Sequence, residues 1–200
     1  MKNLIQIAAA FLLLLLVGCQ TAAPVPVDKY FRLTVLQSPV GTPPLLQDKL
    51  YVAPLRADGP YAERAMLFAS VQQPRELQQY HYQHWSEPPS VLLQEHLRAS
   101  LEAMGLAPLV SDVAFGEGVN YLLNGKILRL EKLNDGSQTK AVVALRLTLH
   151  KKKPFVIMLE RNYSAEELLG DGSQNAYVAA TEVALQRIYS NFRADVKALN

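Results

Sequence analysis

An apolar run near the N-terminus constrains this chain more than any other feature. The single positive side chain Lys2 precedes it, and residues 7–17 contain no polar side chain. This layout is typical of a secretory signal peptide. Because the run is broken at residues 18–20, it is shorter than the roughly 20 apolar residues that a membrane-spanning helix needs. We therefore expect a cleaved signal rather than a permanent membrane span.

The end of this run resembles the lipobox of bacterial lipoproteins. The motif consists of a Leu, an apolar residue, a small residue and an obligatory Cys, here Leu16, Val17, Gly18 and Cys19. The resemblance implies transfer of diacylglycerol to Cys19, cleavage after Gly18 and acylation of the new N-terminus. Cys19 is the only cysteine in 200 residues, which favours this interpretation over an incidental cysteine in an ordinary signal peptide. Since two or three acyl chains hold a protein firmly on a membrane, we expect a lipid-anchored protein.

The rest of the chain has the length and composition of one globular domain. Residues 19–29 are small and proline-bearing, which is typical of a tether, and residues 30–200 suffice for a single core. Hydrophobic residues make up 50% of the sequence and charged residues 19%, which argues against disorder. The 20 Lys and Arg nearly balance the 18 Asp and Glu, so binding to nucleic acid is not supported.

Hydrophobic patterns predict strands, a helix, three further strands and a second helix. Strands are expected over residues 30–36, 49–52, 65–71, 79–85, 119–133, 139–150 and 155–163. The first helix is expected between its N-cap Ser86 and Gly105, the second begins after its N-cap Ser173, and Gly125 is a candidate bulge. We predict an α+β fold, a two-layer sandwich with a mostly antiparallel sheet and two main helices on one face.

Several short motifs resemble those of a known protein family. After the lipobox they follow in the order Tyr30-Phe31-x-Leu33, Val52-Ala53-Pro54, Pro60-Tyr61-Ala62-Glu63-Arg64, Glu76-Leu77 and Trp85-Ser86-Glu87-Pro88. Together they resemble the ABC-type transport auxiliary lipoproteins, the family that includes PqiC. The Trp-small-Glu-Pro block ahead of a helix is the most specific of these motifs. Ser86 and Pro89 stand where the family usually has Ala and Leu.

The resemblance implies a non-enzymatic function in lipid transport. It implies an outer-membrane lipoprotein on the periplasmic face that works with an MCE-domain periplasmic protein. Through that protein it would act with the permease and ATPase of an inner-membrane ABC transporter, moving lipids or other hydrophobic molecules. Gln20 also favours the outer membrane, because lipoproteins kept at the inner membrane commonly carry Asp next to the Cys. The formation of a homo-oligomer stays open.

Two other function classes compete with this one. A general envelope assembly or scaffold lipoprotein without a transporter is the alternative, whereas a lipid-anchored hydrolase lacks a site because no Gly-x-Ser-x-Gly motif is present. His81, His84 and His96 invite a metal interpretation, but a three-residue offset along a strand sends the first two to opposite faces. No catalytic residue, metal or cofactor is therefore predicted.

An aromatic cluster is the candidate partner surface. It consists of Tyr80, Tyr82 and Trp85, and aromatic side chains are common anchors at protein interfaces. The alternative, which we favour for Trp85, is that its ring fills the seam between the sheet and the first helix. The run Lys151–Lys153 could contact anionic headgroups, although a solvated hairpin turn is the favoured interpretation.

Overall fold

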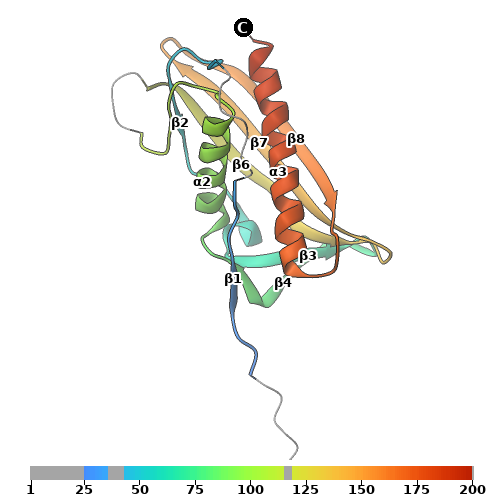
Figure 1. Ribbon diagram of the computed structural model, residues 1–200. Helices are drawn as coiled ribbons and strands as arrows, with labels where there is room; N and C mark the ends of the chain where they lie inside the picture. The colour runs from blue at the N-terminus through green and yellow to red at the C-terminus, as the bar shows by residue number, and fades with distance from the viewer. Residues whose placement is uncertain (1–24, 36–42, 115–118, 200) are drawn as a thin grey trace, which may run out of the picture.

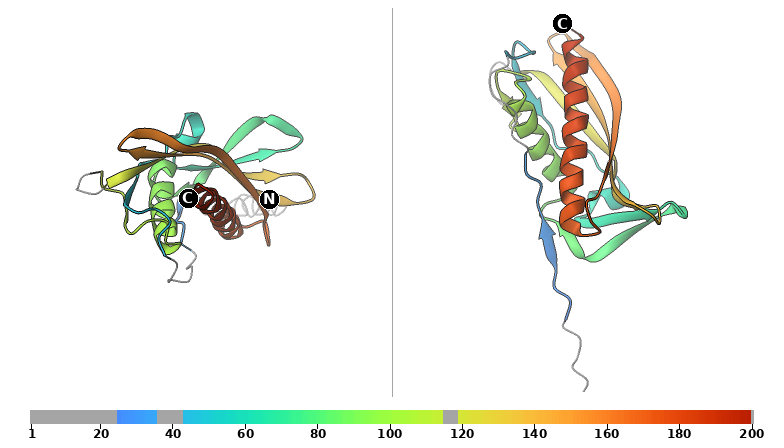
Figure 2. Two further views of the ribbon diagram at one scale, coloured as in Figure 1. Left: turned by 90° about the horizontal axis from the view of Figure 1, so that it is seen from above. Right: turned by 45° about the vertical axis from the view of Figure 1, so that its right-hand side comes forward.

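The computed structural model describes residues 25–35, 43–114 and 119–199. Its strands are β1 (Lys29–Phe31), β2 (Lys49–Val52), β3 (Ala65–Ser70), β4 (Gln73–Trp85), β5 (Val110–Ser111), β6 (Val119–Asn134), β7 (Thr139–Lys152) and β8 (Phe155–Leu168). Its helices are the short 3-10 helix η1 (Gly59–Ala62), α2 (Pro89–Ala103) and α3 (Gln174–Lys197). Figure 1 shows an open, twisted sheet, and Figure 2 shows both main helices on one of its faces. The predicted α+β sandwich is confirmed.

The long strand β6 organises the sheet. One of its edges pairs antiparallel with β7, which in turn pairs antiparallel with β8. Its other edge is shared by two short parallel strands, because β2 pairs with its first residues and β3 with its last. From β3 the sheet continues antiparallel into β4, whose end carries β1, and β5 pairs with β2. The long ladders are thus antiparallel, as predicted, and the parallel pairings are short.

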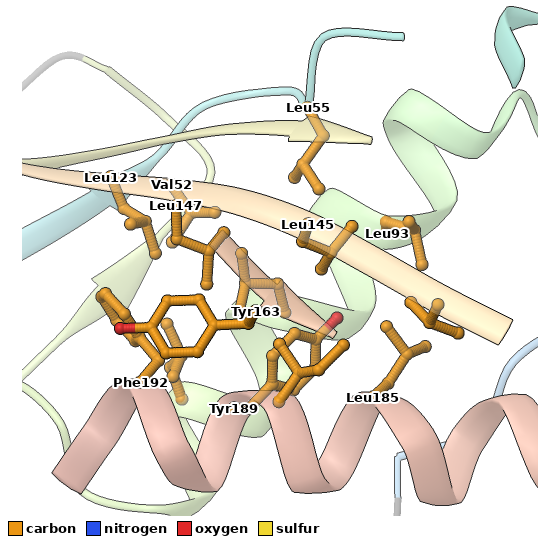
Figure 3. Packing of buried hydrophobic residues seen from close by; sticks show 14 of the residues in the cluster. Val52, Leu55, Leu93, Leu123, Leu145, Leu147, Tyr163, Leu185, Tyr189 and Phe192 are labelled. Atoms are coloured by element: carbon orange, nitrogen blue, oxygen red, sulfur yellow. The ribbon is translucent and has the colours of Figure 1, made fainter. Parts of the chain in front are cut away.

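The core lies between the sheet and the two helices. Helix α2 buries Leu93, Leu97 and Leu101 at the predicted four-residue spacing. Successive side chains of a strand point to opposite faces, and β7 buries every second residue from Ala141 to Leu149 completely. Figure 3 shows part of the resulting contact between the sheet and α3. Its labelled members are Val52, Leu55, Leu93, Leu123, Leu145, Leu147, Tyr163, Leu185, Tyr189 and Phe192.

The ends of several elements differ from the predictions. The first strand ends at Phe31 rather than at residue 36, because the chain then leaves the sheet and Thr34 bonds to both helices. Ser86 is not the N-cap of α2, since Pro88 occupies that position without a side-chain cap bond. Ser173 does cap α3, and its side chain accepts a hydrogen bond from the backbone of Ala176.

Gly125 is not the site of a bulge. The register of β6 against β7 shifts between Ile127 and Arg129, so Leu128 is the additional residue. A Cβ atom on Gly125 would lie 2.7 Å from Cγ of Leu55, closer than real side chains approach. The glycine therefore permits Leu55 to pack directly against the β6 backbone, which is a packing requirement that the local sequence does not reveal.

Candidate partner surface

The first described residues of the chain lie at one end of the domain. Cys19 and the rest of the lipobox are outside the described residues, and the first described residues, 25–28, lead into β1 at the lower end in Figure 1. There Lys29 pairs with Gln83 of β4, and Gln83 in turn accepts a hydrogen bond from Gln174 in the first turn of α3. A membrane anchor on Cys19 would therefore hold the domain by the end at which α3 begins.

Trp85 belongs to the core and not to a partner surface. It is only 1% exposed, and its ring lies 5.9 Å from that of Tyr177 on α3. Its backbone N–H donates to the carbonyl of Arg64 over 2.7 Å. As the last residue of β4, Trp85 directs its side chain to the helical layer, where its ring contacts α3. This burial agrees with the favoured interpretation, that the Trp85 ring fills the core, and removes Trp85 from the candidate partner residues.

The two tyrosines do not form a common surface either. The Tyr80 ring is half-buried against the core, 4.6 Å from the ring of Phe68, and burial raises the pKa of its hydroxyl. Tyr82 is 48% exposed and is the only member of the predicted cluster that could meet a partner with its ring. A single exposed aromatic side chain is common on protein surfaces. The burial of the other two rings therefore gives the cluster no support as a docking surface.

A different segment presents consecutive apolar side chains to solvent. Phe155, Val156 and Ile157 are 67%, 44% and 59% exposed. They follow directly on the turn at Lys153 and Pro154, and Lys151 and Lys152 end the preceding strand β7. We call residues Lys151–Ile157 the hairpin tip. The ring of Phe155 stacks on that of His150 at a centroid distance of 5.2 Å. The hairpin turn at the three lysines is where the sequence predicts it, but the exposed apolar residues beside it were missed.

A sequence signal for this exposure exists. A strand at the edge of a two-layer sandwich can bury only alternate residues, yet residues 155–159 are all apolar. At least two of them must therefore face away from the core. The run was predicted only as the start of a strand, without this exposure.

A charged cleft lies on the sheet face that points away from the helices. Its volume is about 630 Å³, and its walls include Arg56, Lys126 and Arg146. Asp58 lies 2.5 Å from Lys126 and 3.6 Å from Arg56. The hydrogen bond from Lys126 lowers the pKa of the Asp58 carboxyl. Asp58 therefore pairs with two of the three cations, and its single negative charge offsets one of their three positive charges.

The histidines considered for a metal site lie apart. His84 faces Asp28 over 3.5 Å at the β1 end of the sheet, whereas His96 is buried on α2 and bonds to Thr34. Across residues 25–35, 43–114 and 119–199, no three His, Cys, Asp or Glu side chains gather closely enough to hold a metal ion. In the same residues, no helix is long and apolar enough to cross a membrane.

A comparison with protein families decides the assignment. The family model of the ABC-type transport auxiliary lipoprotein component matches residues 60–191, which is more than half of the chain. The chain belongs to this family. The matched residues of the auxiliary lipoprotein run from η1 almost to the end of α3 and include β3–β8 and both main helices. The resemblance seen in the short motifs is thereby confirmed.

Solved structures share the fold of this auxiliary lipoprotein. A protein from Xanthomonas campestris is 22% identical with a TM-score of 0.69, over 82% of this chain and 92% of that one. An uncharacterized protein is 13% identical with a TM-score of 0.67, over 85% and 99%. A hypothetical protein from Chlamydia trachomatis is 11% identical with a TM-score of 0.54, over 77% and 98%. These similarities concern the fold alone, and no curated protein matches the sequence significantly.

Proposed function

We propose that this protein is a non-enzymatic subunit of an ABC-type system that moves lipids or other hydrophobic molecules between two membranes. It is anchored in the outer membrane through acylated Cys19 and docks on a periplasmic MCE-domain protein, which links it to the permease and ATPase. The observation that carries this proposal is the family match over residues 60–191. The lipobox at residues 16–19 adds the anchor.

The chain divides in a way that suits such a subunit. Residues 1–18 serve as the signal peptide, residues 19–29 as the acylated tether and residues 30–200 as a single domain. Because β1 begins at Lys29, the last residue of the tether is already paired with β4. The tether is thus joined to the sheet without a further linker. The opposite end of the domain is left free to meet a partner.

Affinity purification from solubilised membranes tests the transport assignment. The full chain, acylated and tagged after Asn200 through a flexible linker, should recover an MCE-domain protein together with a permease and an ATPase. Recovery of unrelated envelope proteins alone would favour the alternative, a general assembly or scaffold lipoprotein.

The N-terminal peptide of the mature protein tests the anchor separately. Its mass should correspond to a chain that begins at Cys19 with the acyl groups attached, and the protein should fractionate with the outer membrane. A Cys19→Ala variant should not enter that fraction. An unmodified N-terminus beyond Cys19 would contradict the anchor, whatever partner the domain binds.

A further inference from the structure

We propose that the hairpin tip, Lys151–Ile157, is the element with which this protein docks on its partner. The partner surface that it fits is an apolar groove rimmed by carboxylates. This inference rests on the proposed function, because it assigns a surface to the docking step which that function requires.

The fold does not need the apolar side chains of the hairpin tip. Farther along β8, Tyr163 and Ala165 are buried against the helical layer at alternate positions. This burial does not extend to Phe155, whose ring stacks on His150. His150 follows Arg146 and Thr148 at alternate positions of β7, so it shares with them the sheet face that the helices do not cover. Asp195 in the last turns of α3 bonds to Arg161 and Tyr163, and the helix ends at Lys197. Three neighbouring apolar side chains therefore meet water, which is typical of a surface that another molecule covers.

The charge of the hairpin tip is local and uncompensated. Lys151, Lys152 and Lys153 are consecutive, and no ion pair among the described residues involves any of them. The whole chain has a formal net charge of only +2, so its overall field offers little steering. A concentrated basic turn beside exposed apolar residues instead attracts an acidic surface at short range. The exposed apolar side chains of the tip fit an apolar groove on the partner, and its lysines fit carboxylates at the rim of that groove.

The position of the hairpin tip favours a protein partner over the membrane that holds the anchor. Helix α3 begins beside Gln83, which pairs with Lys29, and its far end lies beside Arg161 near the tip. Its 24 residues span about 36 Å. Figure 1 and the right view of Figure 2 show the hairpin tip at one end, with the chain before β1 running away from the other. The described residues before β1, 25–28, thus lie at the end of the domain opposite to the tip.

A photo-reactive phenylalanine analogue at position 155 of the full, acylated chain tests this proposal in cells. After illumination we expect a cross-link from position 155 to the MCE-domain protein. The matched control carries the analogue at Leu168, which lies on the same strand, at its far end, and is 59% exposed, as is Ile157. Position 168 should give no such product.

A second measurement uses substitutions at the hairpin tip. Phe155→Ser combined with Ile157→Ser should reduce recovery of the MCE-domain protein about tenfold or more, as expected for central interface anchors. Changing all three lysines to Gln should remove most of the salt dependence of binding. Leu168→Ser should change recovery by less than about twofold. Because these side chains are exposed, the thermal unfolding of every variant should match that of the wild type.

The possible outcomes separate this proposal from the proposed function. If the wild type recovers the MCE-domain protein and the tip variants do so equally well, the hairpin tip is not the docking element although the function stands. Cross-links from position 155 to phospholipid would contradict the proposal and show that the tip contacts a membrane surface. Cross-links to a second copy of the chain would contradict it as well and show that the tip is a contact within an oligomer. If the wild type recovers no MCE-domain protein, the proposed function fails and this inference with it.

Discussion

Thr34 donates both its backbone N–H and its hydroxyl to the same carboxylate oxygen of Glu182, over 2.6 and 2.7 Å. Its carbonyl lies 3.1 Å from Nε2 of His96. One residue of the segment after β1 is therefore bonded to α3 through Glu182 and to α2 through His96. This segment follows the proposed tether in the chain, so these bonds connect the N-terminal part of the domain to its helical layer.

Replacing Glu182 by Ala should loosen this segment. The two bonds to Thr34 are lost, and the free energy of unfolding should fall by about 1 kcal/mol, since hydrogen bonds near the surface contribute about that amount. Hydrogen exchange of the Thr34 amide should accelerate about fivefold, the factor that corresponds to this energy. The exposed neighbour Val183 provides the control variant, Val183→Ala. Unchanged exchange at Thr34 in Glu182→Ala would show that the bonds do not hold the segment.

Truncating Trp85 should destabilise the domain far more than truncating Tyr82. Trp85→Ala removes a fully buried ring and should lower the free energy of unfolding by about 3–5 kcal/mol. Tyr82→Ala should cost less than about 1 kcal/mol, because the ring is half in water. Urea melts of the two variants measure the difference. Similar stability of both would mean that Trp85 does not pack as described.

The contact of Gly125 with Leu55 predicts a pair of compensating substitutions. Gly125→Ala places a methyl group against Leu55 and should cost about 1–3 kcal/mol by overpacking. Leu55→Ala should cost about 2–5 kcal/mol because it leaves a cavity. The double variant should lose less stability than the sum of the two single losses. The added methyl group at position 125 partly fills the cavity that Leu55→Ala leaves, and the smaller side chain at position 55 removes the clash. Strict additivity in a double-mutant cycle would contradict this contact.

His96 should make the domain less stable in acid. Burial lowers the pKa of its imidazole below the ordinary value, while the carbonyl of Thr34 and the charge of Glu182 act in the opposite direction. Because the unfolded chain then binds the proton first, the full stability is present above about pH 6.5 and falls as the pH decreases below it. His96→Gln retains a donor for Thr34 and removes the titration. Urea melts at pH 7.5 and 5.5 should show a smaller acid loss in this variant than in the wild type.

The elements that the sequence predicts well are those with a regular hydrophobic period. Alternation in β7 and the four-residue spacing in α2 are local signals, and both elements form where they were predicted. The pairing of β2 and β3 along one edge of β6 was not predicted. Strand β2 has four residues and β3 has six, and their partners are distant in the chain. Nothing in such short segments encodes parallel pairing with one particular strand.

The candidate surface was harder to predict than the fold. An aromatic residue looks the same in the sequence whether its ring is buried, as in Trp85, or exposed, as in Tyr82. What separates them is the packing of α3, which begins almost ninety positions after Trp85. The exposure of Phe155 likewise depends on the tertiary structure, because its ring stacks on His150 on the sheet face that α3 does not cover. The turn beside Phe155 was predicted correctly because Pro154 marks a turn independently of tertiary contacts.

Lipid exchange between the two membranes of the cell tests the central claim most directly. Cells that lack this chain should transfer labelled phospholipid between the inner and outer membranes more slowly, and the wild-type gene should restore the rate whereas Cys19→Ala should not. In cells whose partner ATPase is inactive, removing the chain should cause no additional defect, because both act in one transport system. The account would be contradicted if removing the chain slowed lipid exchange as much in ATPase-inactive cells as in wild-type cells. It would also be contradicted if removing the chain left the rate of lipid exchange unchanged.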